Sequence, residues 1–269
     1  MHAGMTERLQ PEILARYGAR NIPRYTSYPT APHFGPAEDD GETRRWLEAL
    51  PEDEAVSLYV HVPFCRAMCW YCGCHTSVSR RAAPVSRYID RVMDEIAMVG
   101  DLLPGRLPAT HLHFGGGTPT LMAPDAFLRI MDQLRRTFQI EKGAELAIEI
   151  DPRTLEPDMV LALALGGITR ASIGVQSFDL RVQEAINRIQ SFAVTRQAVE
   201  RLRAAGVEQI NFDLLYGLPY QDEQSCIATT EQAIELRPDR LSVFGYAHVP
   251  SFKPHQRKIP AEALPQSTG

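Results

Sequence analysis

Short apolar runs recur along the chain, and their length and residue types predict strands. They favour β-branched and aromatic residues and are bounded by Gly, Pro or Asp, which is typical of buried strands. We predict six strands: Leu58–Val62, His111–Phe114, Leu146–Glu149, Ala171–Val175, Gln209–Leu214 and Arg240–Tyr246. Between them, apolar residues recur at three- and four-residue spacing. That spacing predicts helices over Ser86–Val99, Pro124–Phe138, Glu156–Leu165, Val194–Ala205 and Gln224–Glu235.

The alternation of strands and helices indicates parallel strands joined by helical crossovers. Six units are too few for a closed eight-unit barrel, so the expected fold class is α/β, an open, partial (β/α)6 barrel. Ligands bind at the carboxyl ends of the strands in such folds. Chemically distinctive segments lie at or just after those ends: Cys65–Cys72, Gly115–Thr118, Glu149, Gln176, Asp213 and Ala247. The sequence therefore predicts one site at one rim of the sheet.

The composition is that of a globular protein, and it bears on the cellular compartment and on the partners that the protein can bind. Of 269 residues, 44% are hydrophobic and 23% are charged, with a net charge of −5, so the electrostatic footprint of a nucleic-acid binder is missing. The longest apolar run, Met159–Leu165, is far too short to span a bilayer, and the N-terminus has no apolar core typical of a secretory signal. We expect a cytoplasmic monomer that binds neither nucleic acid nor membrane.

The chain divides into three expected segments. Residues 1–50 form an N-terminal arm and leader, residues 51–250 form the core domain, and residues 251–269 begin a linker. The stretch Arg20–Ala31 is rich in Pro, Tyr and Arg, which predicts an extended arm rather than a helix. Packing against the surface and covering the site are both open roles for this arm.

Four of the five cysteines crowd into one short stretch that ends at Cys74. In a reducing compartment such crowding indicates a metal site rather than disulfides. Cys65, Cys69 and Cys72 are separated by three and then two residues, which places three thiolates on one loop. Thiolates hold iron–sulfur clusters, and three of them leave one iron of a four-iron cluster open. Spacing alone leaves a zinc site open as well, because Cys74 or His75 could supply a fourth ligand.

Several motifs, in register with these cysteines, resemble one known family. The cysteine spacing and the glycine run Gly115–Thr118 resemble the signature of the radical S-adenosylmethionine (SAM) superfamily. Further stretches resemble its oxygen-independent coproporphyrinogen III oxidases: Tyr59–Cys65, His113–Thr120, Ile173–Phe178, Ala185–Ser191, Asn211–Pro219, Leu241–Pro250 and the arm sequence RYTSYPTA. Haem-chaperone relatives usually carry a Gly-Arg-x-His string where this chain has Asn187–Gln190, and they usually lack the arm and a cysteine equivalent to Cys74.

The resemblance implies cofactors and residues that hold them. It implies one [4Fe-4S] cluster held by Cys65, Cys69 and Cys72, and two SAM molecules. Contacts to the first SAM are implied for Tyr59, Gly116 and Glu149. Contacts to the second SAM are implied for Tyr71, Gly117, Thr118, Gln176, Arg188, Asp213 and Ala247. His61 and Cys74 are expected near the site, but not as cluster ligands.

The resemblance also implies a reaction. Two propionate arms of coproporphyrinogen III would lose carbon dioxide and become vinyl groups, giving protoporphyrinogen IX in haem biosynthesis without oxygen. A 5′-deoxyadenosyl radical from SAM would remove the hydrogen, and a flavodoxin or ferredoxin would donate electrons. Two alternatives stay open. One is a haem chaperone or iron–sulfur protein without oxidase activity. The other is an inactive truncated form, because family members usually continue into a largely helical C-terminal domain.

Overall fold

Six parallel strands form one sheet in the computed structural model, which describes residues 30, 33–35 and 41–265. In spatial order they are β1 (Val56–Val62), β4 (Pro108–Gly116), β5 (Gln139–Ile150), β6 (Arg170–Gln176), β7 (Gln209–Tyr216) and β8 (Arg240–Gly245). This order is also the chain order, so each strand pairs with the next one along the sequence. The predicted open, partial α/β barrel is confirmed.

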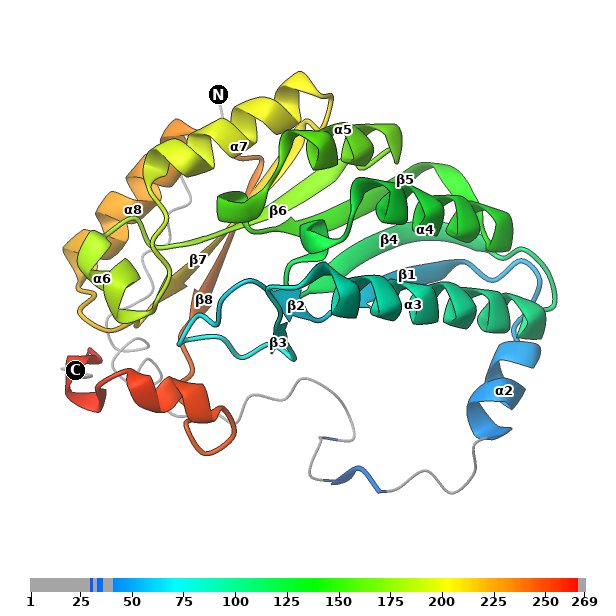
Figure 1. Ribbon diagram of the computed structural model, residues 1–269, viewed down its shortest axis with the longest axis horizontal. Coiled ribbons are helices and arrows are strands. Elements are labelled where there is room, and N and C mark those ends of the chain that lie inside the picture. The colour runs from blue at the N-terminus through cyan, green and yellow to red at the C-terminus, as the bar shows by residue number, and fades with distance from the viewer. Residues whose placement is uncertain (1–29, 31–32, 36–40, 266–269) are drawn as a thin grey trace, which may run out of the picture. The chain divides into compact units, whose positions relative to one another are not determined.

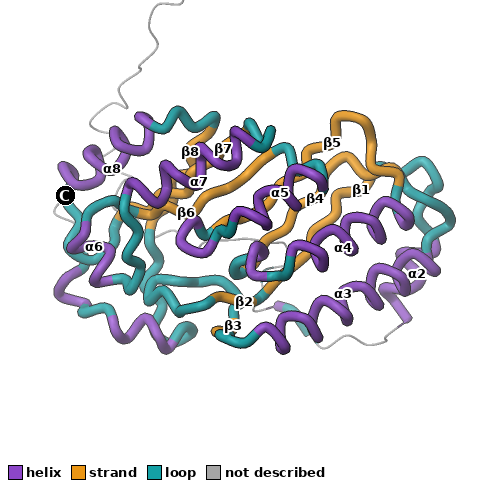
Figure 2. Tube along the Cα trace, turned by 45° about the horizontal axis from the view of Figure 1, so that its top comes forward, coloured by secondary structure: helices purple, strands orange, loops and turns teal. Residues whose placement is uncertain are grey.

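Five helices pack along one face of this sheet, as Figures 1 and 2 show. They are α3 (Ala82–Leu102), α4 (Pro124–Thr137), α5 (Pro157–Leu165), α7 (Phe192–Ala204) and α8 (Glu223–Glu235). Each lies between two consecutive strands, as crossover helices of parallel sheets do. All five match predicted helices, and their bounds differ from the expected ones by a few residues.

Local sequence signals explain where several helices begin. The Ser191 hydroxyl accepts a hydrogen bond from Val194 N at 3.3 Å at the start of α7. Asp222 and Ser225 form a reciprocal capping box at the start of α8. Pro124 occupies the first position of α4, where its missing N–H costs nothing. These three helices begin within two residues of the predicted starts at Pro124, Val194 and Gln224.

The hydrophobic core lies between the sheet and its helices. Phe114 of β4 packs against Phe127 of α4 with 5.3 Å between ring centroids, and both side chains are fully buried. Ile148 of β5 and Phe212 of β7 extend the same core. Because side chains alternate across a strand, the residues next to Ile148 and Phe212 point to the opposite face, and these are Glu149 and Asp213. The core therefore fixes which polar side chains face the inside of the barrel.

Some short or polar elements escaped prediction. The helices α2 (Gly41–Glu48) and α6 (Leu180–Ala185) have too few buried residues for a clear period. Two short strands pair with each other, β2 (Phe64–Cys65) and β3 (Ser77–Val78). The remaining elements are short 3-10 helices: η2 (Pro119–Leu121), η3 (Pro152–Thr154), η4 (Pro254–Lys258) and η5 (Ala261–Ala263).

The glycine run and the segment after β8 both lie within the main compact unit. The strand β4 continues through Gly116, so the glycine run begins inside the strand rather than after it. Residues 251–265 belong to the same compact unit as the sheet. The arm Arg20–Ala31 lies outside the described residues except for position 30. Among the helices of the described segments, none combines the length and the apolar character needed to cross a bilayer.

Gly166 at the end of α5 offers a test of core packing. A Cβ added there would lie 2.5 Å from Cε1 of the buried Phe127 and 3.2 Å from the Ala162 carbonyl oxygen. We expect Gly166→Ala to lower the free energy of unfolding by about 1–3 kcal/mol, because the surroundings are already close-packed. Gly105→Ala is the matched control, since its Cβ would meet nothing within 4 Å. Urea denaturation followed by circular dichroism measures both, and equal stabilities would contradict the packing argument.

Candidate metal and cofactor site

The cysteine loop leaves the sheet after β1 and carries four free thiols. Cys65 ends β2, and its Sγ accepts a hydrogen bond from the Thr118 hydroxyl at 3.5 Å. Cys69 is buried, and its carbonyl accepts from Cys72 N at 3.1 Å. Burial raises the pKa of Cys65, whereas a hydrogen bond from Cys74 lowers the pKa of Cys72. The loop therefore presents thiols in distinct electrostatic surroundings.

The donor set fits an iron–sulfur cluster. Three free cysteines on one loop supply the soft anionic ligands that such clusters need. Within the described ranges, no group of three or more His, Cys, Asp or Glu side chains converges closely enough to hold a single metal ion.

A segment far along the chain holds the backbone of this loop. Three side chains from η4 and its N-cap donate hydrogen bonds to backbone carbonyls of the loop, each to the carbonyl of a different residue. Gln256 Nε2 donates to the Tyr71 carbonyl at 3.0 Å, and His255 Nε2 donates to the Cys72 carbonyl at 2.7 Å. Lys253 Nζ donates to the Cys74 carbonyl at 3.0 Å.

Gln256 also joins this segment to a predicted site residue. Its side chain is 1% exposed, its Oε1 accepts from Val249 N at 2.6 Å, and its Nε2 reaches the Ala247 carbonyl at 3.3 Å. Ala247 is thereby linked to Tyr71 through one amide. These donors were not predicted, because residues 253–258 show no helical or strand period.

The glycine segment lies against the first turn of the cysteine loop. Gly117 N donates to the Val62 carbonyl at 2.9 Å, and a Cβ on Gly117 would lie 2.7 Å from the Phe64 carbonyl oxygen. Gly116 has φ +115°, and its Cβ would lie 2.6 Å from the His61 ring. A side chain at Gly117 would collide with the loop backbone and one at Gly116 with the His61 ring on β1, so close packing requires glycine at both positions.

Glu149 collects polar groups from neighbouring strands. Its Oε2 accepts from Gly116 N at 3.0 Å, and its Oε1 faces His113 Nε2 at 3.3 Å. Tyr59 stacks on His113 with 5.8 Å between ring centroids, and its hydroxyl lies 2.9 Å from His61 Nδ1. The three residues predicted for the first SAM, Tyr59, Gly116 and Glu149, therefore lie together on β1, β4 and β5, with Tyr59 in the middle of its strand.

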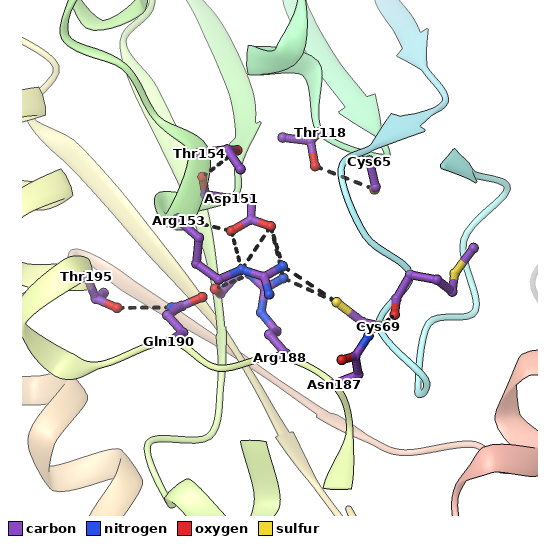
Figure 3. Close-up of polar contacts among 12 residues, drawn as sticks. Cys65, Cys69, Thr118, Asp151, Arg153, Thr154, Asn187, Arg188, Gln190 and Thr195 are labelled. Atoms are coloured by element: carbon purple, nitrogen blue, oxygen red, sulfur yellow. Dashed lines mark hydrogen bonds and ion pairs between the residues drawn. The ribbon is translucent and has the colours of Figure 1, made fainter. Parts of the chain in front are cut away.

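An arginine pair surrounds a single carboxylate beside Cys69, as Figure 3 shows. Asp151 Oδ2 accepts from Arg153 Nη2 at 2.6 Å and from Arg188 Nη1 at 3.3 Å. Arg188 Nη2 also donates to the Gly174 carbonyl at 2.8 Å. Burial alone would raise the pKa of Asp151, but the charge of Arg188 and the hydrogen bonds and charge of Arg153 outweigh burial and lower this pKa to about 2.

Asp151 and Arg153 were not among the predicted site residues, although a signal for them existed. They directly follow β5, and the rule that parallel-sheet sites form at the carboxyl ends of strands applies to them as it does to Glu149.

A second polar network crosses β6, β7 and β8 around Asp213. The Ser172 hydroxyl donates to Asp213 Oδ2 at 3.0 Å, and Asn211 Nδ2 donates to Oδ1 at 2.9 Å. Ser242 donates to Asn211 Oδ1 at 3.1 Å. Burial raises the pKa of Asp213 although both hydrogen bonds oppose it. Gln176 ends β6 with φ 67°, a conformation that is unusual for a residue with a side chain.

The predicted site residues thus divide into linked groups. Direct contacts join Cys65 to Thr118, Cys69 to Arg188, and Gly116 to Glu149. Gln176 and Asp213 lie on the adjacent strands β6 and β7, where Gln176 pairs with Leu214 and Asp213 pairs with Gly174.

The low pKa of Asp151 predicts a pH-dependent contribution to stability. An Asp pKa lowered from 3.8 to about 2 stabilises the folded state by about 2 kcal/mol at neutral pH. This contribution is present above pH 4 and is lost as pH falls toward 2. Asp151→Asn should therefore be about 2 kcal/mol less stable than the parent at pH 7, with a gap that narrows below pH 4. Urea denaturation across this range measures the gap, and a constant gap would contradict the assignment.

Comparison with known proteins places the chain among radical SAM proteins. The family model described as the radical SAM superfamily matches residues 59–233. An oxygen-independent coproporphyrinogen III oxidase of Bradyrhizobium diazoefficiens is 55% identical over 257 residues, which cover 96% of this chain and 57% of that protein. An uncharacterized protein of Sinorhizobium fredii is 50% identical over 187 residues, which cover 70% of this chain and 71% of that relative.

Comparison with solved structures leads to the same family. The structure of coproporphyrinogen III oxidase from Escherichia coli, a radical SAM enzyme, superposes with a TM-score of 0.86 and 38% sequence identity, covering 94% of this chain and 56% of that one. A cobalamin-bound radical SAM methyltransferase from Kitasatospora setae has a TM-score of 0.52 at 15% identity, which shows the fold alone. The chain thus spans a little over half the length of its oxidase relatives. The resemblance drawn from the motifs is confirmed, and the chain belongs to the radical SAM superfamily.

Proposed function

We propose that this chain carries the cluster- and SAM-binding part of an oxygen-independent coproporphyrinogen III oxidase. Its reaction would convert two propionate arms of coproporphyrinogen III to vinyl groups and give protoporphyrinogen IX. The observation that carries this proposal is the arrangement at the rim, where a three-thiol loop, a glycine segment and Glu149 adjoin one another in a chain that matches oxidases over nearly its whole length.

We propose that Cys65, Cys69 and Cys72 hold one [4Fe-4S] cluster, the cofactor that the superfamily implies together with SAM. The reduced cluster and SAM would supply the radical that removes hydrogen from the propionate carbon next to the ring. The residues of the chain bind and orient these groups, since cofactors carry the hard chemistry and proteins position it.

Two SAM molecules form the finer part of the proposal. Tyr59, Gly116 and Glu149 would contact the first, where Glu149 offers a carboxylate beside an exposed Tyr59 ring. Contacts to the second are proposed for the remaining set: Tyr71, Gly117, Thr118, Gln176, Arg188, Asp213 and Ala247. Support comes from Arg188, whose buried Nε has no hydrogen-bond partner in the described part of the chain. A planar guanidinium with a free donor suits a carboxylate.

The remaining proposals concern organisation and partners. Residues 1–50 would form an arm and leader, residues 51–250 the core domain, and residues 251–269 the start of a linker. The protein would work as a monomer in the cytoplasm, take electrons from a flavodoxin or ferredoxin, and bind neither nucleic acid nor membrane.

Anaerobic reconstitution with iron and sulfide tests the function directly. We expect a brown [4Fe-4S] chromophore, SAM cleavage after reduction, and loss of carboxyl groups from coproporphyrinogen III detected by mass spectrometry. Cys69→Ala should abolish all three, because a missing thiolate leaves an iron without its ligand. Cys226→Ala is the matched control, since this thiol lies on α8, outside the cysteine loop.

The outcomes separate the alternatives. SAM cleavage without decarboxylation would indicate a SAM-cleaving module that does not act on this substrate. Stoichiometric haem binding in place of decarboxylation would identify a haem chaperone, and either result would sink the oxidase proposal for this chain.

Glu149 provides a test of the first SAM site. Glu149→Gln removes the charge while it keeps the shape, and hydrogen bonds to charged groups contribute about 1.5–3 kcal/mol. We expect the Kd for SAM to rise about tenfold or more, because tenfold corresponds to about 1.4 kcal/mol. Equilibrium dialysis of the reconstituted protein measures this Kd. Glu141→Gln, an exposed change on the same strand, should leave it unchanged, and an unaltered Kd in Glu149→Gln would remove Glu149 from the site.

A further inference from the structure

Two guanidinium groups converge on the sulfur of a single cysteine. Arg153 Nη2 lies 3.7 Å from Cys69 Sγ, and Arg188 Nη1 lies 3.6 Å from the same atom. Figure 3 shows the guanidinium groups of Arg153, from η3, and of Arg188, from the loop between α6 and α7, both directed at Cys69. Both distances are within the range for N–H donors to sulfur, so Cys69 has two cationic donors.

The charges around Cys69 do not cancel. Asp151 binds both guanidinium groups and remains ionised at neutral pH, because its pKa is about 2. One negative charge therefore faces two positive charges, which leaves an excess of one positive charge beside the sulfur. The side chains of Asp151 and Arg188 are only 12% and 7% exposed, so water screens this excess weakly.

Arg153 is the more firmly fixed of the two donors. Its Nε and Nη2 bind the two oxygens of Asp151 at 2.9 and 2.6 Å, and its backbone N donates to Asp151 Oδ1 at 3.1 Å. This two-residue unit at the start of η3 holds the guanidinium in one orientation. Arg188, by contrast, is the residue that we propose for a SAM carboxylate. Arg153 would therefore stay on Cys69 whatever Arg188 binds.

We propose that Arg153 is a positioning residue that sets the reduction potential of the cluster through its contact with Cys69 Sγ. Hydrogen bonds to the sulfurs and nearby charge tune the potentials of iron–sulfur clusters. Reduction adds one negative charge to the cluster, and a fixed cation beside a ligand sulfur stabilises that added charge. Arg153 thus raises the potential and makes the cluster easier to reduce. This inference rests on the proposed cluster ligation by Cys69.

The proposal is tested by two substitutions that change the local charge in opposite directions, one at Arg153 and one at Asp151. The full chain is reconstituted anaerobically, and its cluster is titrated with reductant while electron paramagnetic resonance follows the reduced form. Arg153→Gln removes a positive charge and should lower the reduction equilibrium constant about tenfold, which is about 59 mV for one electron. Asp151→Asn removes the negative charge from the same unit and should shift the potential upward.

The signs of the two potential shifts distinguish an electrostatic effect on the cluster from a structural disturbance of the site. A purely structural role would disturb the site in both variants and move both potentials in the same direction. Arg153→Lys keeps the charge but loses the forked pair with Asp151, so its potential should lie between those of the parent and Arg153→Gln. Arg196→Gln is the matched control, because Arg196 is an exposed arginine in an i,i+4 ion pair on α7, and its potential should equal that of the parent.

The proposal is overturned by an unchanged potential in Arg153→Gln, by shifts of the same sign in Arg153→Gln and Asp151→Asn, or by an equal shift in the control. Should Arg153→Gln fail to take up iron, the signs of the Arg153→Lys and Asp151→Asn shifts decide the matter. Failure of the proposed cluster ligation looks different, because the parent protein would then form no [4Fe-4S] chromophore at all. Failure of the oxidase reaction alone would leave the chromophore and the expected shifts in potential in place.

Discussion

The register of the six parallel strands is the constraint on which the candidate site depends. Pairing places Val62 beside Gly116, Glu149 beside Ser172, and Gly174 beside Asp213. A shift of one residue in any strand would turn its polar side chains toward the helices and its apolar ones toward the inside of the barrel. The buried side chains on the helical face therefore specify the site on the other face, because the same backbone alternation serves both.

This coupling explains why so much could be predicted from the sequence. The apolar positions of Leu146–Ile150 identify a buried strand, and the same alternation then puts Glu149 on the opposite face. Parallel topology brings the end of that strand to the same rim as the ends of its neighbours. Residues that are distant in sequence, such as Cys65 and Thr118, could thus be expected to meet. The hydrogen bond between their side chains agrees with that expectation.

Contacts that need no periodic pattern could not be predicted. Gln256 donates a hydrogen bond to the carbonyl of Tyr71, which lies 185 positions earlier in the sequence. Neither a hydrophobic alternation nor a motif marks a single amide side chain that makes such a contact. The segment that follows β8 has a polar, Pro-containing sequence that reads as a linker. Its role is apparent only in three dimensions, where it fixes the backbone of the cysteine loop. Local sequence specifies elements well, whereas complementary packing between distant loops depends on the complete fold.

The arginine pair shows how the protein balances stability against the chemistry of the site. Burying two guanidinium groups is costly, and a second carboxylate would offset that cost more fully. Instead, Asp151 binds both, the Gly174 carbonyl takes one further N–H, and Arg188 Nε keeps no partner among the described residues. Such an imbalance is typical of sites built for an anionic group rather than for stability alone. Both guanidinium groups lie within hydrogen-bond distance of Cys69 Sγ, so the excess positive charge of this site is concentrated beside one sulfur of the cysteine loop.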